Sequence, residues 1–289
     1  PLSEDERAAG RVPEGAEALD MPDWLWPGFS ASLGAEAVPA AEALRHRAPV
    51  FLRVNTLRNT LDEAQAALAT EGIETRTHPL ADTALEVIAG ARGIARSAAF
   101  TEGLVELQDA ASQAVVAQLP LGPGQRVLDY CAGGGGKALA MAARLRGAVE
   151  AHDADPGRMS DLPARAARAG AEIVRTAKPS GRYDLVLCDV PCSGSGSWRR
   201  APEGKWRLTE EGLTRLLSVQ AGILDTVAPL VADGGTLAYA TCSMLAPENA
   251  AQVESFLGRH AGWQVVTQRQ FLPRDGGDGF FMACLTRTA

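Results

Sequence analysis

Polar and apolar residues alternate in three short stretches near the start of the chain, as they do in half-buried strands. A helix is predicted from Thr60, between the first two stretches, because Asp62 and Glu63 place acidic side chains in its first turn. A small α+β unit over residues 47–100 accounts for this pattern. The three predicted strands are VFLRVN (50–55), IETRTH (73–78) and ALEVIA (84–89).

From about residue 101 the pattern changes to apolar strands that alternate with helices. This alternation is typical of a parallel sheet covered on both faces, so the predicted class is α/β with a domain over residues 101–289. Residues 1–46 are expected to form a helical or extended segment in which PDWLWPGF packs two tryptophans and Phe29 onto the body. The predicted strands of the domain are RVLDYC, AVEAHDAD, EIVRT, YDLVLCDV and GTLAYATC, with WQVV and FFMACLTRT as closing strands at its far edge.

The composition, with 46% hydrophobic and 22% charged residues, is that of a soluble globular protein. No run approaches the roughly 18 apolar residues of a membrane span, and no signal peptide opens the chain. Five cysteines without paired spacing and four scattered histidines argue against a disulfide framework and against structural zinc. We therefore expect a cytoplasmic protein with no membrane contact and no metal.

The net charge of −7 weighs against nucleic acid as a partner. Arginine nevertheless gathers in two places, and its guanidinium group suits bidentate phosphate contacts. On charge alone both clusters are interpreted as solvated faces. The clusters are Arg45, Arg47, Arg53 and Arg58, and Arg199, Arg200, Lys205 and Arg207.

A glycine run between a strand and a helix, in LDYCAGGGGKALAMAA, predicts a ligand site. Ligands of such folds bind outside the carboxyl ends of the strands, and backbone N–H groups at a helix N-terminus attract an anion. The spacing is not GxGxxG, which disfavours a pyrophosphate. Asp153, at the end of the next strand, can accept hydrogen bonds from both ribose hydroxyls, although it also fits a helix N-cap. Together these features predict a nucleoside cofactor with a smaller anion, such as the carboxylate of S-adenosylmethionine.

Two cysteines follow the ends of neighbouring predicted strands. YDLVLCDV ends in Asp189 and runs into Cys192, and GTLAYATC ends in Cys242. A thiolate can add to carbon 6 of a pyrimidine and make carbon 5 nucleophilic, and a carboxylic acid at ring atom N3 would stabilise that adduct. We expect Asp189 in the latter role. The sequence pattern alone leaves open which of the two cysteines attacks. The other three cysteines, Cys131, Cys188 and Cys284, are interpreted as small buried hydrophobes.

Several ordered motifs resemble the Sun/RsmB family of RNA cytosine-5 methyltransferases over residues 20–289. The motifs are LRVNTLR, GLVELQDAASQ, CAGGGGK, DVPCSGSG, TCSMLAPEN and DGFFMA. The resemblance implies a seven-stranded, Rossmann-like class I methyltransferase domain that uses S-adenosylmethionine, preceded by an RRM-like module. It also implies that Cys242 is the nucleophile, that Cys192 helps to release the product and that Lys137 lies at the base of the active site. Glu248 and Asn249, after Pro247, are expected to start a helix and to position the loop of Cys242.

The resemblance further implies a set of binding residues. Asp153 would hold the ribose, and Asp189 would lie between cofactor and base. The RRM-like module and the arginine clusters would then have to recognise RNA. We therefore favour phosphate contacts for Arg199, Arg200 and Lys205, which follow the Pro-Cys loop. Trp198 and Trp206 fit base stacking and packing equally well. The implied cofactor set is Cys131, Ala132, Gly133, Gly134, Gly135, Gly136, Lys137, Asp153, Arg158, Thr176 and Asp189, and the implied RNA set is Arg53, Asn55, Arg199, Arg200 and Lys205.

Two departures from the family pattern affect the expected cofactor site. Gly133, Gly134 and Ala138 replace the alanine, proline and threonine of CAAPGGKT, which makes the loop less rigid. Thr176 replaces an aspartate that contacts the adenine side of the cofactor in many members, so weaker cofactor binding is expected. We also expect RNA recognition without the helical N-terminal RNA-binding domain of the ribosomal RNA members.

From these residues and the resemblance we expect an RNA cytosine-5 methyltransferase that acts as a monomer, with ribosomal RNA as the expected substrate. Transfer RNA and DNA are alternative substrates, and the paired cysteines disfavour a small-molecule substrate. A non-catalytic RNA-binding assembly factor is an alternative of another class. The presence of Cys192, Cys242 and Asp189 together favours the enzyme, because a binding protein has no use for two thiols at one place.

Overall fold

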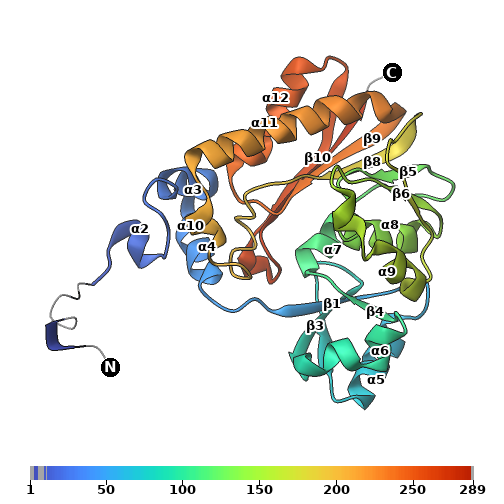
Figure 1. Ribbon diagram of the computed structural model, residues 1–289, viewed down its shortest axis with the longest axis horizontal. Coiled ribbons are helices and arrows are strands. Elements are labelled where there is room, and N and C mark those ends of the chain that lie inside the picture. Colours follow the sequence, from blue (N-terminus) through green and yellow to red (C-terminus); the bar gives the residue numbers. More distant parts are fainter. Residues whose placement is uncertain (1–2, 6–9, 11, 288–289) are drawn as a thin grey trace.

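The structure is a computed structural model and describes residues 3–5, 10 and 12–287. Residues 1, 2, 6–9, 11, 288 and 289, which belong to the two terminal regions expected from the sequence, lie outside the described residues. The described part consists of two sheets, the helices packed on each of them and a group of N-terminal helices (Figure 1).

The small sheet has four strands in the order β2-β3-β1-β4, and all adjacent pairs are antiparallel. Thr60 caps the helix of this module through a reciprocal capping box with Glu63, as the acidic first turn suggested. The last strand pairs with β1 and lies beyond the boundary at residue 100 expected for the module. In chain order the elements are β1 (Val50–Val54), α5 (Leu61–Thr70), β2 (Glu74–Thr77), β3 (Ala84–Ala89), η2 (Ala91–Arg96), α6 (Ala98–Thr101) and β4 (Val105–Leu107).

The large sheet has seven strands in the order β10-β11-β9-β8-β5-β6-β7. Strand β11 runs antiparallel to both of its neighbours, and the other adjacent pairs are parallel. The predicted strands and their far-edge closing pair are thereby confirmed. The strands are β5 (Val127–Asp129), β6 (Val149–Ala151), β7 (Ile173–Arg175), β8 (Tyr183–Asp189), β9 (Val231–Thr241), β10 (Trp263–Phe271) and β11 (Phe280–Arg287).

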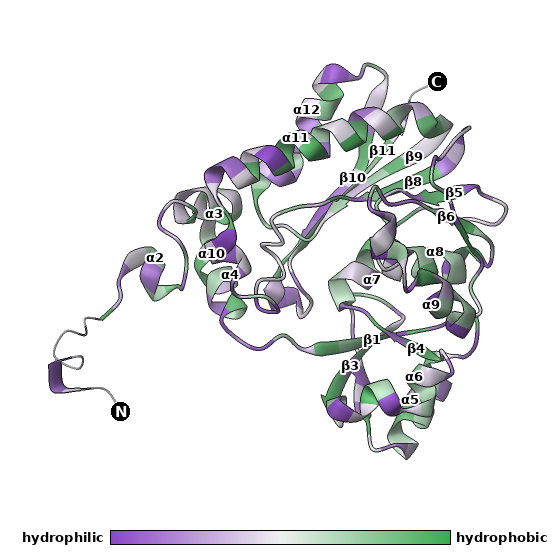
Figure 2. Ribbon diagram, in the orientation of Figure 1, coloured by the Kyte–Doolittle hydropathy of each residue, from purple (hydrophilic) through white to green (hydrophobic). Residues whose placement is uncertain are grey.

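Helices cover both faces of the large sheet, as the alternating pattern predicted (Figure 1). One core forms under α7 (Ala110–Ala117), α8 (Gly136–Leu145) and α9 (Leu162–Ala169). The other forms under α11 (Glu210–Val227) and α12 (Ala250–Arg259). The inner strands are therefore hydrophobic, whereas the edge strand β10 is hydrophilic along most of its length (Figure 2).

The N-terminal helices pack against the loops that follow β8 and β9. Phe29 is fully buried, and Trp24 and Trp26 are partly buried, which confirms the expected packing of PDWLWPGF. Their core includes Met244 and Leu245, just after Cys242. No helix within the described residues is both long and apolar enough to cross a membrane. The remaining elements are α2 (Gly15–Ala18), α3 (Trp26–Leu33), η1 (Gly34–Glu36), α4 (Ala37–Leu44), η3 (Pro156–Met159), α10 (Gly204–Arg207), η4 (Ala228–Leu230), η5 (Ala246–Glu248) and η6 (Pro273–Asp275).

Candidate active site

Polar side chains from four neighbouring strands meet at the carboxyl-terminal edge of the large sheet. Asp129 ends β5, Asp153 follows β6, and Asp189 ends β8. Cys242 directly follows β9, beside β8 in the sheet. Because parallel strands end on the same edge, this is where an α/β sheet of this kind binds its ligands.

The two cysteines predicted to act together are in contact. The Sγ atoms of Cys192 and Cys242 lie 3.4 Å apart, within hydrogen-bonding distance, although 50 residues separate them in the sequence. Both side chains are partly exposed. The backbone N–H of Gly196 donates a 2.9 Å hydrogen bond to the carbonyl of Cys242, which joins the loop after β8 to the loop after β9. The thiols are therefore held together by the backbone of both loops.

A buried carboxylate, that of Glu248, connects the same two loops. Its Oε1 accepts hydrogen bonds from the backbone N–H of Ser193 at 2.8 Å and from the side chain of Gln220 at 3.0 Å. Its Oε2 accepts from the hydroxyls of Ser193 and Ser243, both at 2.5 Å. Asn249 adds a hydrogen bond from its side-chain amide to the carbonyl of Ser243 at 2.9 Å. The structure confirms that both residues position the loop of Cys242.

The environment of the two thiols favours opposite protonation states. The pKa of Cys242 is lowered from its ordinary value, chiefly by a hydrogen bond from Cys192 and also by the charge of Lys137. The pKa of Cys192 is raised well above its ordinary value by the hydrogen bond with Cys242, by burial and by the nearby charges of Cys242 and Glu248. Cys242 is therefore the better thiolate and Cys192 the better proton carrier.

An ion pair lies beside the thiols. The Nζ of Lys137 is 2.6 Å from Oδ2 of Asp189, and only 8% of the lysine side chain is exposed. The ammonium also lies 4.7 Å from the centre of the Phe280 ring, on β11. Lys137 thus sits in a packed position with its charge directed at Asp189.

The glycine run forms a tight turn between β5 and α8. Gly135 has φ +78°, and a Cβ atom there would lie 2.1 Å from Leu162, so no other residue fits without strain. The backbone N–H of Gly133 donates a 2.9 Å hydrogen bond to Asp153, whose carboxylate also lies 3.4 Å from the guanidinium of Arg158. The expected ribose-binding carboxylate is therefore next to the loop.

A cavity of 330 Å³ opens between this loop and the strand ends. Asp189 and Arg158 line it, as do most of the expected loop residues; Gly135, Asp153 and Thr176 are not among its lining residues. Sequence reasoning missed five other lining residues, although the QDAAS segment was noted as part of a motif. The five are Leu107, Gln108, Ser112, Asp129 and Arg165.

Asp129 is the most informative of the missed residues. It is 1% exposed, and neither carboxylate oxygen has a hydrogen-bond partner among the described residues. Burial and the charge of Asp189 raise its pKa to about 7. An unpartnered buried acceptor costs free energy unless a donor arrives. Its place at the last residue of β5, directly before the glycine run, was the signal in the sequence.

These groups fit S-adenosylmethionine. Asp129 offers an acceptor for an ammonium group, and Asp153 can accept from ribose hydroxyls. The N-terminus of α8 offers backbone donors for a carboxylate. Thr176 lies apart from the cavity, where its backbone N–H bonds to Ala151 at 2.9 Å and its carbonyl lies 3.1 Å from the ring of His152.

The structure corrects most of the RNA-binding residues expected from the sequence. Arg53, Asn55 and Lys205 are at most 4% exposed, and the Arg199 side chain is 5% exposed. Each is held by internal partners, so none is free to contact RNA. Of the five, Arg200 is the exposed one, with 38% of its side chain exposed, and it pairs with Asp109 and Asp278. The internal partners are Gln108 and the carbonyl of Gly136 for Arg53, the carbonyls of Gly103 and Ala169 for Asn55, Asp278 for Arg199 and Asp20 for Lys205.

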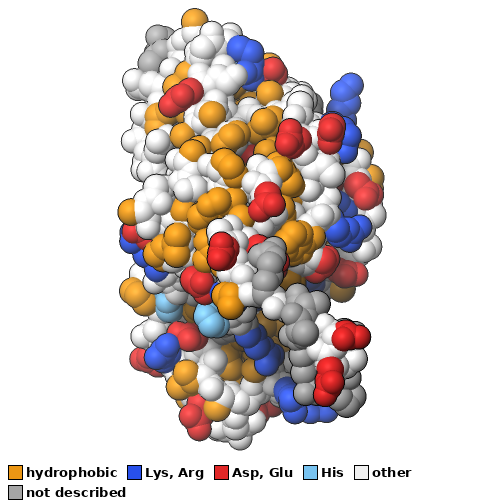
Figure 3. All heavy atoms as spheres, turned by 90° about the vertical axis from the view of Figure 1, so that its left-hand side faces the viewer, with side chains coloured by type: hydrophobic (Ala, Val, Ile, Leu, Met, Phe, Trp, Pro, Cys, Tyr) orange, Lys and Arg blue, Asp and Glu red, His pale blue; other side chains and the backbone are white. Residues whose placement is uncertain are grey.

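The two tryptophans after the Pro-Cys loop differ in exposure. Trp198 is 2% exposed and donates a 3.2 Å hydrogen bond to the carbonyl of Ser193, which makes it a packing residue. Trp206 is 54% exposed. On the face shown in Figure 3 the basic side chains are dispersed among acidic and hydrophobic ones and form no single patch. The buried Cys188 and Cys284 match their expected role, whereas Cys131 is partly exposed and lines the cavity.

Two family profiles match the chain. The family described as "16S rRNA methyltransferase RsmB/F" matches residues 116–286. A second, described as "Methyltr_RsmF/B-like, ferredoxin-like domain", matches residues 21–92. Strand order and connectivity of the small sheet agree with a ferredoxin-like module.

Relatives of known name extend this match. The chain is 34% identical over 288 residues to the ribosomal RNA small subunit methyltransferase B of Pectobacterium carotovorum, with 92% of this chain and 66% of that protein covered. It thus spans about two-thirds of the relative. The crystal structure of PH0851 aligns with a TM-score of 0.89 at 28% identity, over 96% of this chain and 69% of that one. NSun6 from Pyrococcus horikoshii, solved with SFG, aligns with a TM-score of 0.83 at 17% identity, over 93% and 98% of the two chains, and shows the same fold.

Proposed function

This chain belongs to the 16S rRNA methyltransferase RsmB/F family, and from that premise we propose that it methylates carbon 5 of a cytosine in ribosomal RNA. The methyl donor is S-adenosylmethionine, and the reaction passes through a covalent cysteine–cytosine adduct. The name of the relative in Pectobacterium supports ribosomal RNA as the substrate class. Because ribosomal RNA of a bacterial cell is in the cytoplasm, we propose that the protein acts there.

The observation that carries the proposal is the 3.4 Å contact between the two thiols, next to the Lys137–Asp189 ion pair that lines the cofactor cavity. Adduct chemistry needs one sulfur as a nucleophile and a second group to handle a proton. Cys242 and Cys192, 3.4 Å apart, meet that need. A methyltransferase that methylates without a covalent adduct has no use for this pair.

The proposed steps follow from these side chains. The Cys242 thiolate adds to carbon 6 of the ring, while a proton taken from solvent and delivered by way of Asp189 neutralises ring atom N3. The bound cofactor supplies an electrophilic methyl group, which carbon 5 takes. Cys192 then removes the proton of carbon 5, the bond between carbon 6 and sulfur breaks, and Cys242 leaves as a thiolate while N3 returns its proton.

The chain has a physical reason to use Cys192 late. Its pKa is raised mainly because Cys242 accepts its hydrogen bond and carries negative charge. Once the Cys242 sulfur is bonded to carbon, that acceptor and that charge are gone. The Cys192 proton then passes to solvent more readily, so Cys192 becomes a thiolate base only after the adduct has formed, and it regains a proton when it removes the one on carbon 5.

Cofactor binding is assigned to the loop from Cys131 to Lys137, with Asp129 for the ammonium, Asp153 and Arg158 at the ribose and Asp189 near the reacting base. Thr176 remains the proposed substitute for an adenine-side aspartate. For RNA, the exposed members of the arginine clusters replace the buried ones as the proposed phosphate contacts. These exposed residues are Arg45, Arg47, Arg58, Arg200 and Arg207.

The test is transfer of labelled methyl groups to unmodified ribosomal RNA by the parent, Cys242→Ala and Cys192→Ala. We expect label in 5-methylcytidine for the parent and none for Cys242→Ala. For Cys192→Ala we expect a protein–RNA adduct that persists in denaturing gels, because release is blocked. Cys284→Ala, a change at a buried thiol on β11, is the control and should behave as the parent.

Label found only on transfer RNA, or only on DNA, would replace ribosomal RNA by that nucleic acid as the substrate. Cofactor binding without label on any nucleic acid would replace the enzyme with a binding function. Full activity of Cys242→Ala would overturn the proposed nucleophile.

A further inference from the structure

Two arginines grip the backbone of the glycine loop. The carbonyl of Gly134 accepts a hydrogen bond from the guanidinium of Arg165 on α9. The carbonyl of Gly136 accepts one from Nη1 of Arg53 at 2.6 Å. Both glycines line the cofactor cavity, as does Arg165. The loop is thus held from outside by charged donors, which make stronger hydrogen bonds than neutral ones.

Both arginines are anchored by the small module. Arg53 lies on β1 directly opposite Glu106 on β4, so the two side chains share one face of the small sheet. Glu106 is 2% exposed, and its carboxylate accepts hydrogen bonds from Arg165, at 3.1 Å, and from Arg168. A single buried carboxylate therefore fixes the arginine that holds Gly134.

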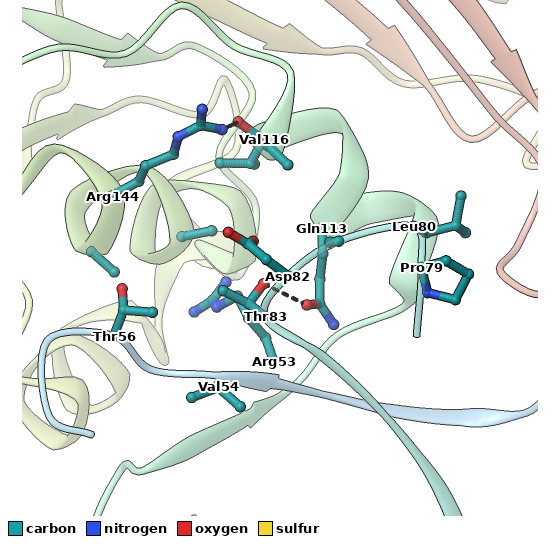
Figure 4. A pocket seen from close by; sticks show the side chains of 14 residues that line it. Arg53, Val54, Thr56, Pro79, Leu80, Asp82, Thr83, Gln113, Val116 and Arg144 are labelled. Atoms are coloured by element: carbon teal, nitrogen blue, oxygen red, sulfur yellow. Dashed lines mark hydrogen bonds between the residues drawn. The ribbon is translucent and has the colours of Figure 1, made fainter. Parts of the chain in front are cut away.

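Arg53 borders a second cavity on one side and the glycine loop on the other. Figure 4 shows it extending from β1 in this cavity, of 340 Å³, which Gln113 and Arg144 also line. On its other side Nη1 donates to Gln108 at 2.6 Å as well as to Gly136, and Gln108 lines the cofactor cavity. Its guanidinium is thereby directed at the loop.

The loop itself has little intrinsic rigidity. Glycine occupies each position from 133 to 136, and glycine loses more backbone freedom on ordering than any other residue. A site that must order such a loop when its ligand binds loses affinity to that ordering. External contacts that order the loop beforehand would remove this loss.

We propose that Arg165 and Arg53 are positioning residues for the cofactor, and that Glu106 of the small module sets cofactor affinity through Arg165. The support for this proposal is that the guanidinium groups of Arg165 and Arg53 donate hydrogen bonds to the carbonyls of Gly134 and Gly136. This inference rests on the proposed function, because it takes S-adenosylmethionine as the ligand of the loop.

The chain offers a matched control for Arg165. Arg168 lies on the same helix, pairs with the same Glu106 carboxylate and has a similarly exposed side chain, 23% against 25%. Its guanidinium lies 4.2 Å from the centre of the Phe100 ring, and among the described residues it makes no hydrogen bond to the glycine loop. Each of Arg165→Met and Arg168→Met therefore removes one positive charge from beside Glu106. Only Arg165→Met also removes the hydrogen bond to the carbonyl of Gly134.

The experiment is calorimetric titration of S-adenosylhomocysteine into the parent and both variants, with hydrogen exchange of residues 133–137 measured alongside. We expect Arg165→Met to bind about tenfold more weakly, the loss of one hydrogen bond to a charged group, and its loop amides to exchange faster. Arg168→Met should bind within about twofold of the parent. In methyl transfer, KM for the cofactor should rise in Arg165→Met while kcat is kept.

A second variant guards against a general effect of the mutation. Glu106→Gln should weaken cofactor binding too, and Glu106→Gln combined with Arg165→Met should cost less than the sum of the two, because both act on one contact. Equal binding by the parent and Arg165→Met, or equal loss in Arg165→Met and Arg168→Met, would overturn the inference. A parent that binds no cofactor would instead refute the proposed function.

Discussion

The backbone N–H of Ser193 donates a 2.8 Å hydrogen bond to the carboxylate of Glu248. Ser193 follows one active-site cysteine, and Glu248 lies in the turn after the other. The spacing of the two thiols is therefore set by a carboxylate that takes no part in the chemistry. Such a group is expected to matter for stability as much as for rate.

Glu248→Gln is expected to lower the free energy of unfolding by about 2–4 kcal/mol. Four donors face the carboxylate, and an amide can accept from only one of its two heavy atoms, so donors lose their acceptor. Urea denaturation checks the value. Glu254→Gln, a change of an exposed residue on α12, should stay within about 0.5 kcal/mol of the parent, and an equal effect of both would refute the role of Glu248.

Asp129→Asn should change how stability depends on pH. The pKa of Asp129 is about 7 in the folded protein against 3.8 ordinarily, so the folded state keeps a proton that the unfolded chain has lost. This proton contributes at most about 4 kcal/mol to the free energy of unfolding. The contribution is fully present below about pH 4 and is lost as the pH rises to 7. The parent should therefore lose stability relative to Asp129→Asn between pH 4 and pH 8.

The free energies of unfolding of both proteins, measured by urea denaturation at pH 4 and pH 8, decide this point. A parent-minus-variant difference that is the same at the two pH values would show that Asp129 does not titrate in this range. Asp161→Asn, at an exposed carboxylate before α9, serves as the control. Cofactor binding should also weaken in Asp129→Asn, because the proposed acceptor of the ammonium is lost.

Lys205→Met should reduce stability and leave RNA affinity unchanged. The Lys205 side chain is 2% exposed and pairs with Asp20, whose side chain is 47% exposed, so about 1–3 kcal/mol is expected after allowance for solvent. Arg207→Met, on the same short helix but exposed, should leave stability unchanged and reduce the salt dependence of RNA binding by about one ion. Thermal unfolding and filter binding at several salt concentrations test both. Weaker RNA binding by Lys205→Met at full stability would restore its sequence-based role.

The strands and helices could be predicted because their signals are local. Alternation in VFLRVN, and a capping threonine followed by Asp62 and Glu63, require no knowledge of distant residues. The chemistry at the strand ends followed from topology, since Asp189 and Cys242 close adjacent strands. The QDAAS residues at the cavity were not assigned a role because nothing local marks a helix start as a cavity wall.

The roles of the basic residues could not be predicted in this way. Lys205 is buried because Asp20 reaches it from 185 residues away, and Arg199 because Asp278 does so from 79 residues away. Charge and position in the sequence looked the same for these residues as for the exposed Arg207. The difference between a phosphate contact and a buried ion pair lies entirely in the tertiary fold.

The packing of the N-terminal helices on the loop after β9 has a consequence for how the protein is made. The hydroxyl of Ser32 accepts a 2.9 Å hydrogen bond from the N–H of Ala246, across 214 residues of sequence. While the ribosome is still adding β9, the first helices have emerged, but Met244, Leu245 and Leu272, which complete their core, have not yet been made. The loop that follows Cys242 is thus packed against these helices only near the end of translation, although the helices are made first.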